Sequence, residues 1–495
     1  MRFKKIHKGL FIFVLSVILV FNFFQYFVPD RVKVLLIGLL ISILSITVVL
    51  YRIKIFGISD PVLIFSLIFL FYNGLVLINF SYFLNYGVLA LELFPTSFTS
   101  NVVLKASFFA LTSYFGFLGG VLILQNEKRL SNDSSIKYDF NNENLNYDSL
   151  ILLSVIFYFL GIVMFFLTYS GIKGFVGSLS INRVARLNTL AQESSLPYPG
   201  FIFVSIAIMF YVSLCKKSKL FFLIFSMFFS FLALLLILQG DRRFLVYSII
   251  ILIVIWGVVY GDEYLKKLSF SRLIPMFLLV LFGYLLFSFF EKVRFLIPII
   301  VSKMWTWNES LAWIKTHISI DWFMPARTEF GAPYFSLLYY LQNNTSRLYG
   351  SSYAFALPYL IPRRFYPGIK PPFLADVFSL RIHDEFMSTS NVVKGWGYSP
   401  IAEAFQNFGL VGPFLVFFVL AIFIVKLSSL KKRGFWGTLT FALLMPELLN
   451  FNRMCFAPVF QEAVFIIIPE IILYIIYEIL QSLKDLSANE SSSRY

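Results

Sequence analysis

Long runs of apolar residues, separated by short polar segments, dominate the chain up to about residue 480. Most runs have about the 17–25 residues that an α-helix needs to cross roughly 30 Å of hydrocarbon. Because lipid offers no partner to a backbone amide, we expect helices here and not isolated strands. The pattern predicts twelve transmembrane helices, at residues 9–28, 33–51, 61–80, 102–124, 149–169, 201–215, 220–238, 244–260, 273–290, 401–425, 434–450 and 456–480.

The predicted helices are unevenly distributed along the chain. Residues 1–290 hold the first nine, joined by short loops except for an outer segment at 171–200. The long segment 291–399 precedes the last three helices at 400–480, and residues 481–495 form a cytoplasmic tail. The first run lacks a small-residue cleavage site after its apolar core, so we expect a retained helix and not a signal peptide.

Composition supports the same class of protein. The chain is 59% hydrophobic and 14% charged, with a mean hydropathy of +0.81, which excludes a soluble protein of 495 residues. The sequence therefore predicts an all-α polytopic integral membrane protein. The net charge of +15 requires no nucleic acid as partner, because much of it anchors loops at the surface of the lipid bilayer.

The basic residues predict the orientation. With the N-terminus inside, the inner segments hold 15 lysines and 6 arginines, and the outer segments hold 7 lysines and 12 arginines. The lysine excess follows the positive-inside rule, and an even number of helices places both termini in the cytoplasm. The outer loops are rich in arginine, at Arg183, Arg186, Arg242, Arg243, Arg294, Arg327, Arg347, Arg363, Arg364, Arg381 and Arg453.

Arginine in outer loops indicates an anionic ligand. Its planar guanidinium matches two oxygens of a phosphate or carboxylate and stays charged near a low-dielectric boundary. A lipid pyrophosphate is the natural candidate. The alternative is that the arginines only reach toward lipid headgroups, which explains one residue more easily than the whole set.

The outer segment 291–399 is the predicted active or binding region. It holds five of the seven tryptophans and many prolines, which favours short, aromatic-anchored interfacial pieces. Long loops of this kind in compact proteins are usually functional. Within it, Arg363 and Arg364 lie between two prolines in "IPRRFYP". In the other outer segment, Arg183 and Arg186 are spaced to share one face of a helix.

Candidate acids lie at the edges of this region. In "GYSPIAEAFQNFGLVGPF" (397–414), Ser399 can cap a helix, Glu403 lies in its first turn, and Asn407 shares a face with Glu403. Glu403 either stabilises the helix end or acts as a general base. Glu329 comes two residues after Arg327. The two side chains form either an exposed ion pair or a phosphate-binding arginine beside a catalytic acid. Further polar residues near the outer helix ends are Glu447, Asn450, Asn452, Arg453, Gln461 and Glu462.

Several chemistries have no motif in this chain. No Walker loop, dinucleotide fingerprint, zinc-ligand spacing or nucleophile elbow is present. Two cysteines and three histidines form no metal-binding cluster in the sequence. The inner loops are too small for a nucleotide-sugar site, which leaves a membrane-borne donor presented at the outer side.

The topology, "GDRRF" and the segment from "IPRRFYP" through "GYSPIAEAFQNFGLVGPF" resemble bacterial oligosaccharide repeat-unit polymerases, the Wzy-type polymerases of O-antigen and capsule. The topological likeness covers nearly the whole chain, and the motif likeness a small part of it. The resemblance implies a fold similar to the GT-C-like transferases of lipid-linked sugars, in the bacterial inner membrane. It also implies glycosyl transfer without metal or cofactor, from a chain on undecaprenyl pyrophosphate to an incoming lipid-linked unit, with a chain-length regulator as a further partner.

The resemblance also implies roles for the candidate residues. Donor pyrophosphate would be held by Arg242, Arg243, Arg363 and Arg364. The phosphates of the acceptor lipid would be held by Arg183, Arg186 and Arg327. The general base would be Glu403, oriented by Asn407, with Glu329 as the second candidate.

Other functions stay open at this point. A flippase for lipid-linked oligosaccharides also needs buried positive charge, but it typically has short outer loops, unlike segment 291–399. An O-antigen ligase shares the topology and uses an outer-loop histidine, although His383 in "RIHDEF" fits no such pattern. A transporter is favoured least, because no pair of broken helices is visible.

Overall fold

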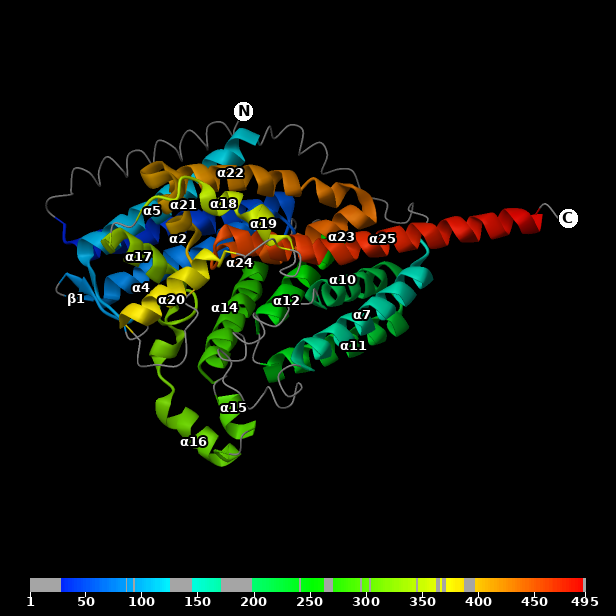
Figure 1. Cartoon of the computed structure of the whole chain (residues 1–495), viewed down its shortest axis with the longest axis horizontal. Helices are drawn as coiled ribbons and strands as arrows, with labels where there is room; N and C mark the ends of the chain where they lie inside the picture. Colours follow the sequence, from blue (N-terminus) through cyan, green and yellow to red (C-terminus); the bar gives the residue numbers. More distant parts are fainter. Residues whose placement is uncertain are drawn as a thin grey trace.

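The computed structural model is almost entirely helical over the residues it describes (Figure 1). Those residues are 28–85, 87–91, 94–124, 145–170, 198–239, 242–261, 270–293, 296–301, 304–343, 346–361, 366, 371–386 and 397–492.

Nine helical segments in these ranges are long and apolar enough to cross a membrane. All nine coincide with predicted runs, which confirms the prediction of an all-α polytopic membrane protein. They are α2 (Asp30–Phe56); α3 (Pro61–Phe69) continuing through η2 (Leu70–Leu75) into α4 (Val76–Phe83); α5 (Ser100–Leu124); α7 (Tyr147–Ser170); α10 (Tyr198–Lys216); α11 (Lys219–Gln239); α12 (Arg242–Trp256) with η4 (Gly257–Gly261); α21 (Pro400–Phe408) with η8 (Gly409–Val411) and α22 (Gly412–Leu427); and α25 (Phe456–Ser492).

The other three predicted runs have different outcomes. The run 9–28 lies outside the described residues, apart from its last position. The run 273–290 falls in α14 (Phe270–Val293), which runs steeply across the direction of α22 and α25 in Figure 1. The run 434–450 forms two helices, α23 (Gly434–Leu444) and α24 (Pro446–Phe451). Proline at the start of α24 has no amide hydrogen to continue the preceding helix, so the run is interrupted there.

The described part of the segment predicted as short interfacial pieces consists of short helices. Two of them, α17 (Ala332–Asn343) and α20 (Leu374–Phe386), lie beside the β-strands at one end of the bundle, whereas α15 (Leu296–Val301) and α16 (Trp307–His317) lie apart from the strands (Figure 1). We call the strands together with α17 and α20 the loop end. Its strands β1 (Leu84–Asn85), β2 (Val88–Leu89) and β3 (Phe98–Thr99) pair antiparallel in that order. The helices of the segment are α15 (Leu296–Val301), α16 (Trp307–His317), η5 (Ile320–Phe323), η6 (Pro325–Arg327), α17 (Ala332–Asn343), α18 (Ser351–Ala354), α19 (Ala356–Tyr359) and α20 (Leu374–Phe386).

Aromatic packing attaches the loop end to the membrane helices. Phe335 of α17 stacks on Phe94, with ring centroids 5.0 Å apart, and makes edge contacts with Phe98 and Phe378. Tyr334 of the same helix is buried against Phe80 of α4. Buried aromatic area of this kind is a large source of stabilisation, so α17 forms part of the core and is not a surface loop.

Two glycines bring α5 and α22 into backbone contact. A Cβ atom on Gly116 would lie 2.2 Å from the carbonyl oxygen of Phe414, and one on Gly120 would lie 2.5 Å from that of Phe418. Spacing by four residues places both glycines on one face, the arrangement by which small residues allow membrane helices to approach closely. Larger side chains at these positions would force the helices apart.

Another close approach occurs where α25 contains a proline. Pro469 has no amide hydrogen, so the carbonyl of Phe465, four residues earlier, loses its usual helical partner. Gly200 of α10 lies at this place: a Cβ atom there would be 2.6 Å from the Phe465 carbonyl oxygen and 3.0 Å from Pro469 Cγ. The absence of a side chain on Gly200 therefore lets α10 pack directly on the interrupted turn.

Candidate functional site

A buried polar cluster lies where α12, α24 and α25 meet. Arg243, the second residue of α12, pairs with Glu462 of α25, with 2.7 Å between Nη1 and Oε1. The guanidinium also lies over the ring of Phe244, 4.6 Å from its centroid. The side chains of Arg243 and Glu462 are 22% and 28% exposed, so the pair is only partly shielded from solvent and from ligands.

Asn450 of α24 joins a second carboxylate to this pair. Its side-chain amide donates to Glu462 Oε2 at 2.7 Å and to Glu447 Oε2 at 3.1 Å. Asn450 and Glu447 are buried. One amide thus orients two carboxylates, and one of those carboxylates orients Arg243. We call Arg243, Tyr247, Glu447, Asn450 and Glu462 the Arg243–Glu462 cluster.

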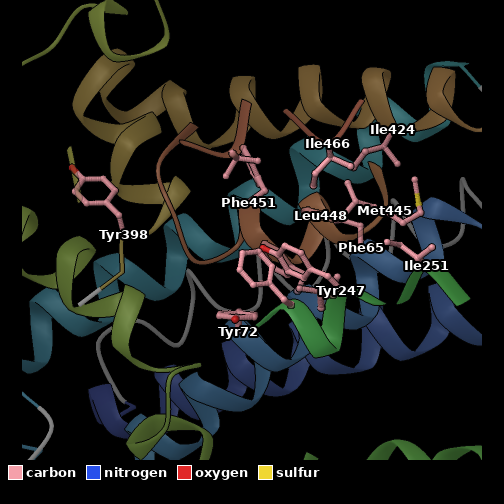
Figure 2. Packing of buried hydrophobic residues seen from close by; sticks show 14 of the residues in the cluster. Phe65, Tyr72, Tyr247, Ile251, Tyr398, Ile424, Met445, Leu448, Phe451 and Ile466 are labelled. Carbon is pink, nitrogen blue, oxygen red and sulfur yellow. The ribbon is translucent and has the colours of Figure 1, made fainter. Parts of the chain in front are cut away.

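Three polar atoms of the cluster have no hydrogen-bond partner within the part of the chain that the structure describes. They are the Tyr247 hydroxyl, Glu447 Oε1 and Asn450 Oδ1. Tyr247 is fully buried and lies among Tyr72, Leu448 and Phe451 in Figure 2. Buried polar atoms are nearly always paired with protein, water or ligand. Three such atoms in one cluster are unusual for a helical core, and they mark the cluster as a candidate functional site.

A second arginine–carboxylate pair lies close to the first. Arg453, in the turn between α24 and α25, is 3.7 Å from Glu329 Oε2, and the two side chains are 25% and 22% exposed. Burial opposes the charge on Arg453, but Glu329 favours it, and the net effect raises its pKa. The charges of Arg243 and Arg453 both act on the Tyr247 hydroxyl. The two pairs therefore form one electrostatic neighbourhood.

Glu403 lies in a different set of contacts, beside α18. It is 1% exposed, and both carboxylate oxygens accept hydrogen bonds: Ser352 Oγ donates to Oε1 at 2.6 Å, and the Phe456 N–H donates to Oε2 at 2.7 Å. Asn407, on the same helix face as predicted, donates to the Glu403 carbonyl and to Ser352 Oγ, both at 2.8 Å. Its own carbonyl oxygen accepts from the Gly350 N–H at 2.9 Å. These contacts join α18, α21 and the first residue of α25.

The local structure around Glu403 forms as the sequence indicates. The Ser399 hydroxyl accepts from the Ile401 N–H at 3.3 Å and so caps α21, and Pro400 occupies the first helical position. Gly409 ends the helix with a φ of +67°, a conformation that glycine adopts without strain. The predicted span 401–425 is therefore two helices joined by one tight turn.

The other arginines predicted to bind phosphate are placed as follows. Arg327 pairs with Asp321 at 2.7 Å and lies over Phe83, 4.7 Å from the ring centroid. Arg242 begins α12, and its side chain is outside the described part. Four arginines also lie outside the described residues: Arg183, Arg186, Arg363 and Arg364.

Sequence reasoning did not find Tyr247 or the convergence of α12 with α24. Tyr247 lies four residues after Arg243, so helical spacing alone would have placed both on one face. Glu447, Asn450, Arg453 and Glu462 were noted as polar residues near helix ends, without a shared partner. No group of three histidine, cysteine or acidic side chains close enough to hold a metal ion occurs among the described residues.

The arrangement offers two kinds of chemistry. Two guanidinium groups can bind phosphate oxygens and stabilise negative charge on a leaving group. Neighbouring carboxylates can orient those guanidinium groups or accept a proton from a hydroxyl.

Comparison with protein families gives a match, whereas two further comparisons give none. No curated protein and no solved structure matches the chain. Residues 379–484 match the family model of the O-antigen polysaccharide polymerase Wzy. The matched segment contains Glu403, Glu447, Asn450, Arg453 and Glu462. This match confirms the family resemblance and supports the role of a glycosyltransferase-type polymerase for a multi-pass membrane protein. Over residues 379–484, about a fifth of its length, the chain is similar to the O-antigen polysaccharide polymerase Wzy family.

Proposed function

We propose that the protein joins oligosaccharide repeat units, each carried on undecaprenyl pyrophosphate, into a polysaccharide at the outer face of the bacterial inner membrane. The observation that carries this proposal is the meeting of two arginine–carboxylate pairs, Arg243–Glu462 and Arg453–Glu329. Arg453 lies between α24 and α25, Glu462 lies on α25, and Glu329 precedes α17. Arg453 and Glu462 lie inside the segment matched to the polymerase family. The excess of arginine in the predicted outer segments supports the outer face.

The arginines act on the donor. Arg243 and Arg453 bind oxygens of the pyrophosphate, which leaves when the bond from the anomeric carbon to the phosphate oxygen breaks. Guanidinium groups match this leaving group in geometry and stabilise the charge that develops on it. Glu462 and Asn450 position Arg243. The predicted phosphate ligands outside the described residues, among them Arg363 and Arg364, complete the binding of the two lipid substrates, and Arg327 serves the acceptor lipid.

A carboxylate acts on the acceptor. The acceptor hydroxyl oxygen forms the new bond to the anomeric carbon, and its proton passes to a general base. Glu403 is 1% exposed with both oxygens hydrogen-bonded, and Glu462 is held by Arg243 at 2.7 Å. Glu329 is 22% exposed and lies 3.7 Å from Arg453. We therefore assign the general base to Glu329, and to Glu403 the positioning of α25.

The test uses the purified protein in liposomes, supplied only with the lipid-pyrophosphate-linked repeat unit of its source strain. Products are separated on a glycan-resolving gel. A ladder of repeats supports the proposal, and a unit that stays single overturns it. The same liposomes then report the alternatives, through movement of the unit across the bilayer for a flippase or its transfer to lipid A for a ligase.

A further inference from the structure

A cavity at the loop end is formed by elements other than those of the Arg243–Glu462 cluster. Its volume is about 340 Å³, within the range of small-molecule sites. Three segments line it: the strand β3 with the residues before it, the C-terminal half of α17, and the last turns of α20. These elements lie together in Figure 1, beside β1. Eight residues line the cavity, and six of them carry polar side chains.

The polar groups of the cavity are balanced in charge and varied in hydrogen bonding. Gln342 and Asn343 each offer donors and an acceptor, and Thr96 offers a hydroxyl. The charged groups are Arg381 and Glu385, one helical turn apart on α20. Such a set can bond to many hydroxyl groups that both donate and accept.

A tyrosine orients the carboxylate of the cavity. The Tyr339 hydroxyl donates to Glu385 at 2.6 Å to Oε1 and 2.8 Å to Oε2. Burial and the neighbouring Glu385 raise the pKa of Tyr339 to about 12, so the hydroxyl stays protonated at neutral pH. Glu385 is thereby fixed in place, and its remaining acceptor capacity is directed to whatever occupies the cavity.

The lining excludes two ligand classes. A pyrophosphate requires an excess of positive charge, and here Glu385 offsets Arg381. An apolar ligand would leave several polar groups without partners, at a cost in free energy. The rings of Phe98 and Phe386 add apolar faces beside the polar groups. A saccharide combines these properties, because it has many hydroxyl groups and apolar C–H faces.

We propose that this cavity binds a saccharide segment of the growing polysaccharide, apart from the pyrophosphate and the reacting bond. The identity of that saccharide rests on the proposed function. The cavity is tied to the helix entrance of the matched family segment, because Ser336 of α17 accepts a hydrogen bond from the Ser399 N–H at 2.9 Å. A chain held here stays near the enzyme between additions, so occupancy of the cavity sets how many units are added before release.

Binding is tested without requiring turnover. The probe is the surface polysaccharide of the source strain, released from lipid by mild acid and separated into single repeat units and longer oligomers. Saturation-transfer NMR measures its binding to the protein in nanodiscs. We expect the oligomers to bind more tightly than the single unit. We also expect Glu385→Gln and Gln342→Ala each to weaken oligomer binding about tenfold, the effect of losing or weakening one hydrogen bond to the saccharide.

The control is Glu478→Gln, the same change at an exposed carboxylate near the far end of α25, which leaves binding unchanged. Thermal unfolding confirms that each variant is folded. Oligomers that do not bind, or that bind the two cavity variants as tightly as the unsubstituted protein, overturn the proposal. If single units bind as well as oligomers, the cavity serves the acceptor and the assignment to the growing chain is wrong.

Turnover separates this proposal from the proposed function. In the liposome assay, Glu385→Gln should shift the ladder toward shorter chains, whereas Glu478→Gln should leave it unchanged. If the protein binds oligomers through the cavity but builds no ladder, the saccharide site is supported and the proposed polymerase function is wrong. If the Glu385→Gln variant makes chains of unchanged length, the cavity does not control chain length. The proposal that the protein is a polymerase is not affected by that result.

Discussion

The carboxylate of Glu403 accepts a hydrogen bond from the backbone N–H of Phe456 at 2.7 Å, and so caps α25 from another helix. The first amides of any helix lack partners within that helix. Here one of them is satisfied by a side chain 53 residues earlier in the sequence. Since Glu462 lies fewer than two turns further along α25, the cap also fixes the carboxylate that holds Arg243.

We expect Glu403→Ala to lower the free energy of unfolding by about 3 kcal/mol, because the Ser352 hydroxyl and the Phe456 amide both lose their acceptor in a buried place. Thermal unfolding in detergent measures the loss. Ser352→Ala should give a smaller loss in the same direction. If Glu403→Gln keeps full thermal stability but makes no glycosidic bonds, Glu403 is the base and not a positioning residue.

Arg243→Lys should reduce polymer formation by roughly 10²–10³-fold, because lysine lacks the planar fork that binds two oxygens of the leaving group. Arg31→Lys, at an exposed arginine in the first turn of α2, is the matched control. The initial rate of ladder formation is the measurement. Equal rates for the two variants would remove Arg243 from the site.

Glu462→Gln should be much less harmful in the Arg243→Lys background than in the unsubstituted protein. The reason is that the two side chains act through one contact of 2.7 Å, and effects of contacting residues do not add. Rates for the four proteins of this cycle measure the coupling. Additive losses would show that Glu462 acts on the reaction independently of Arg243.

Glu329→Gln should lower kcat by roughly 10²–10⁴-fold, the contribution of a general base, with little change in KM. Glu309→Gln is the control in the same segment, because glutamine can also complete the capping box with Thr306 at the start of α16. A loss confined to KM would assign Glu329 to binding and leave the base to another carboxylate.

Gly116→Ala should destabilise the protein by about 1–3 kcal/mol, because its Cβ atom would lie 2.2 Å from the Phe414 carbonyl oxygen. Gly119→Ala, in the same helix, meets nothing closer than 3.7 Å. It should be neutral or slightly stabilising, since alanine favours helix over glycine. Thermal unfolding compares the two, and a similar loss for both would contradict the close backbone contact between α5 and α22.

The helices were predictable from the sequence because each membrane span satisfies its own backbone hydrogen bonds, so the signal is local. Ser399 and Pro400 likewise predicted the start of α21 correctly. The partners of the site were not predictable in this way. Arg243 and Glu462 are 219 residues apart, and their meeting depends on how α12 packs against α25. Nor does hydropathy show that the predicted span breaks at Pro446, or that Glu447 and Asn450 join the same cluster.

The packing of Gly200 on the interrupted turn of α25 has a mechanical consequence. With 37 residues, α25 is about 55 Å long, well beyond the roughly 30 Å of a bilayer interior, and it extends past the other helices in Figure 1. The contact between Gly200 and Pro469 divides α25 into a short N-terminal part that carries Glu462 and a longer C-terminal part that leaves the bundle. When α25 tilts as one rigid helix about this contact, a small shift of Glu462 produces a larger displacement at the C-terminal end. A spectroscopic label at that end would therefore detect ligand binding at the Arg243–Glu462 cluster.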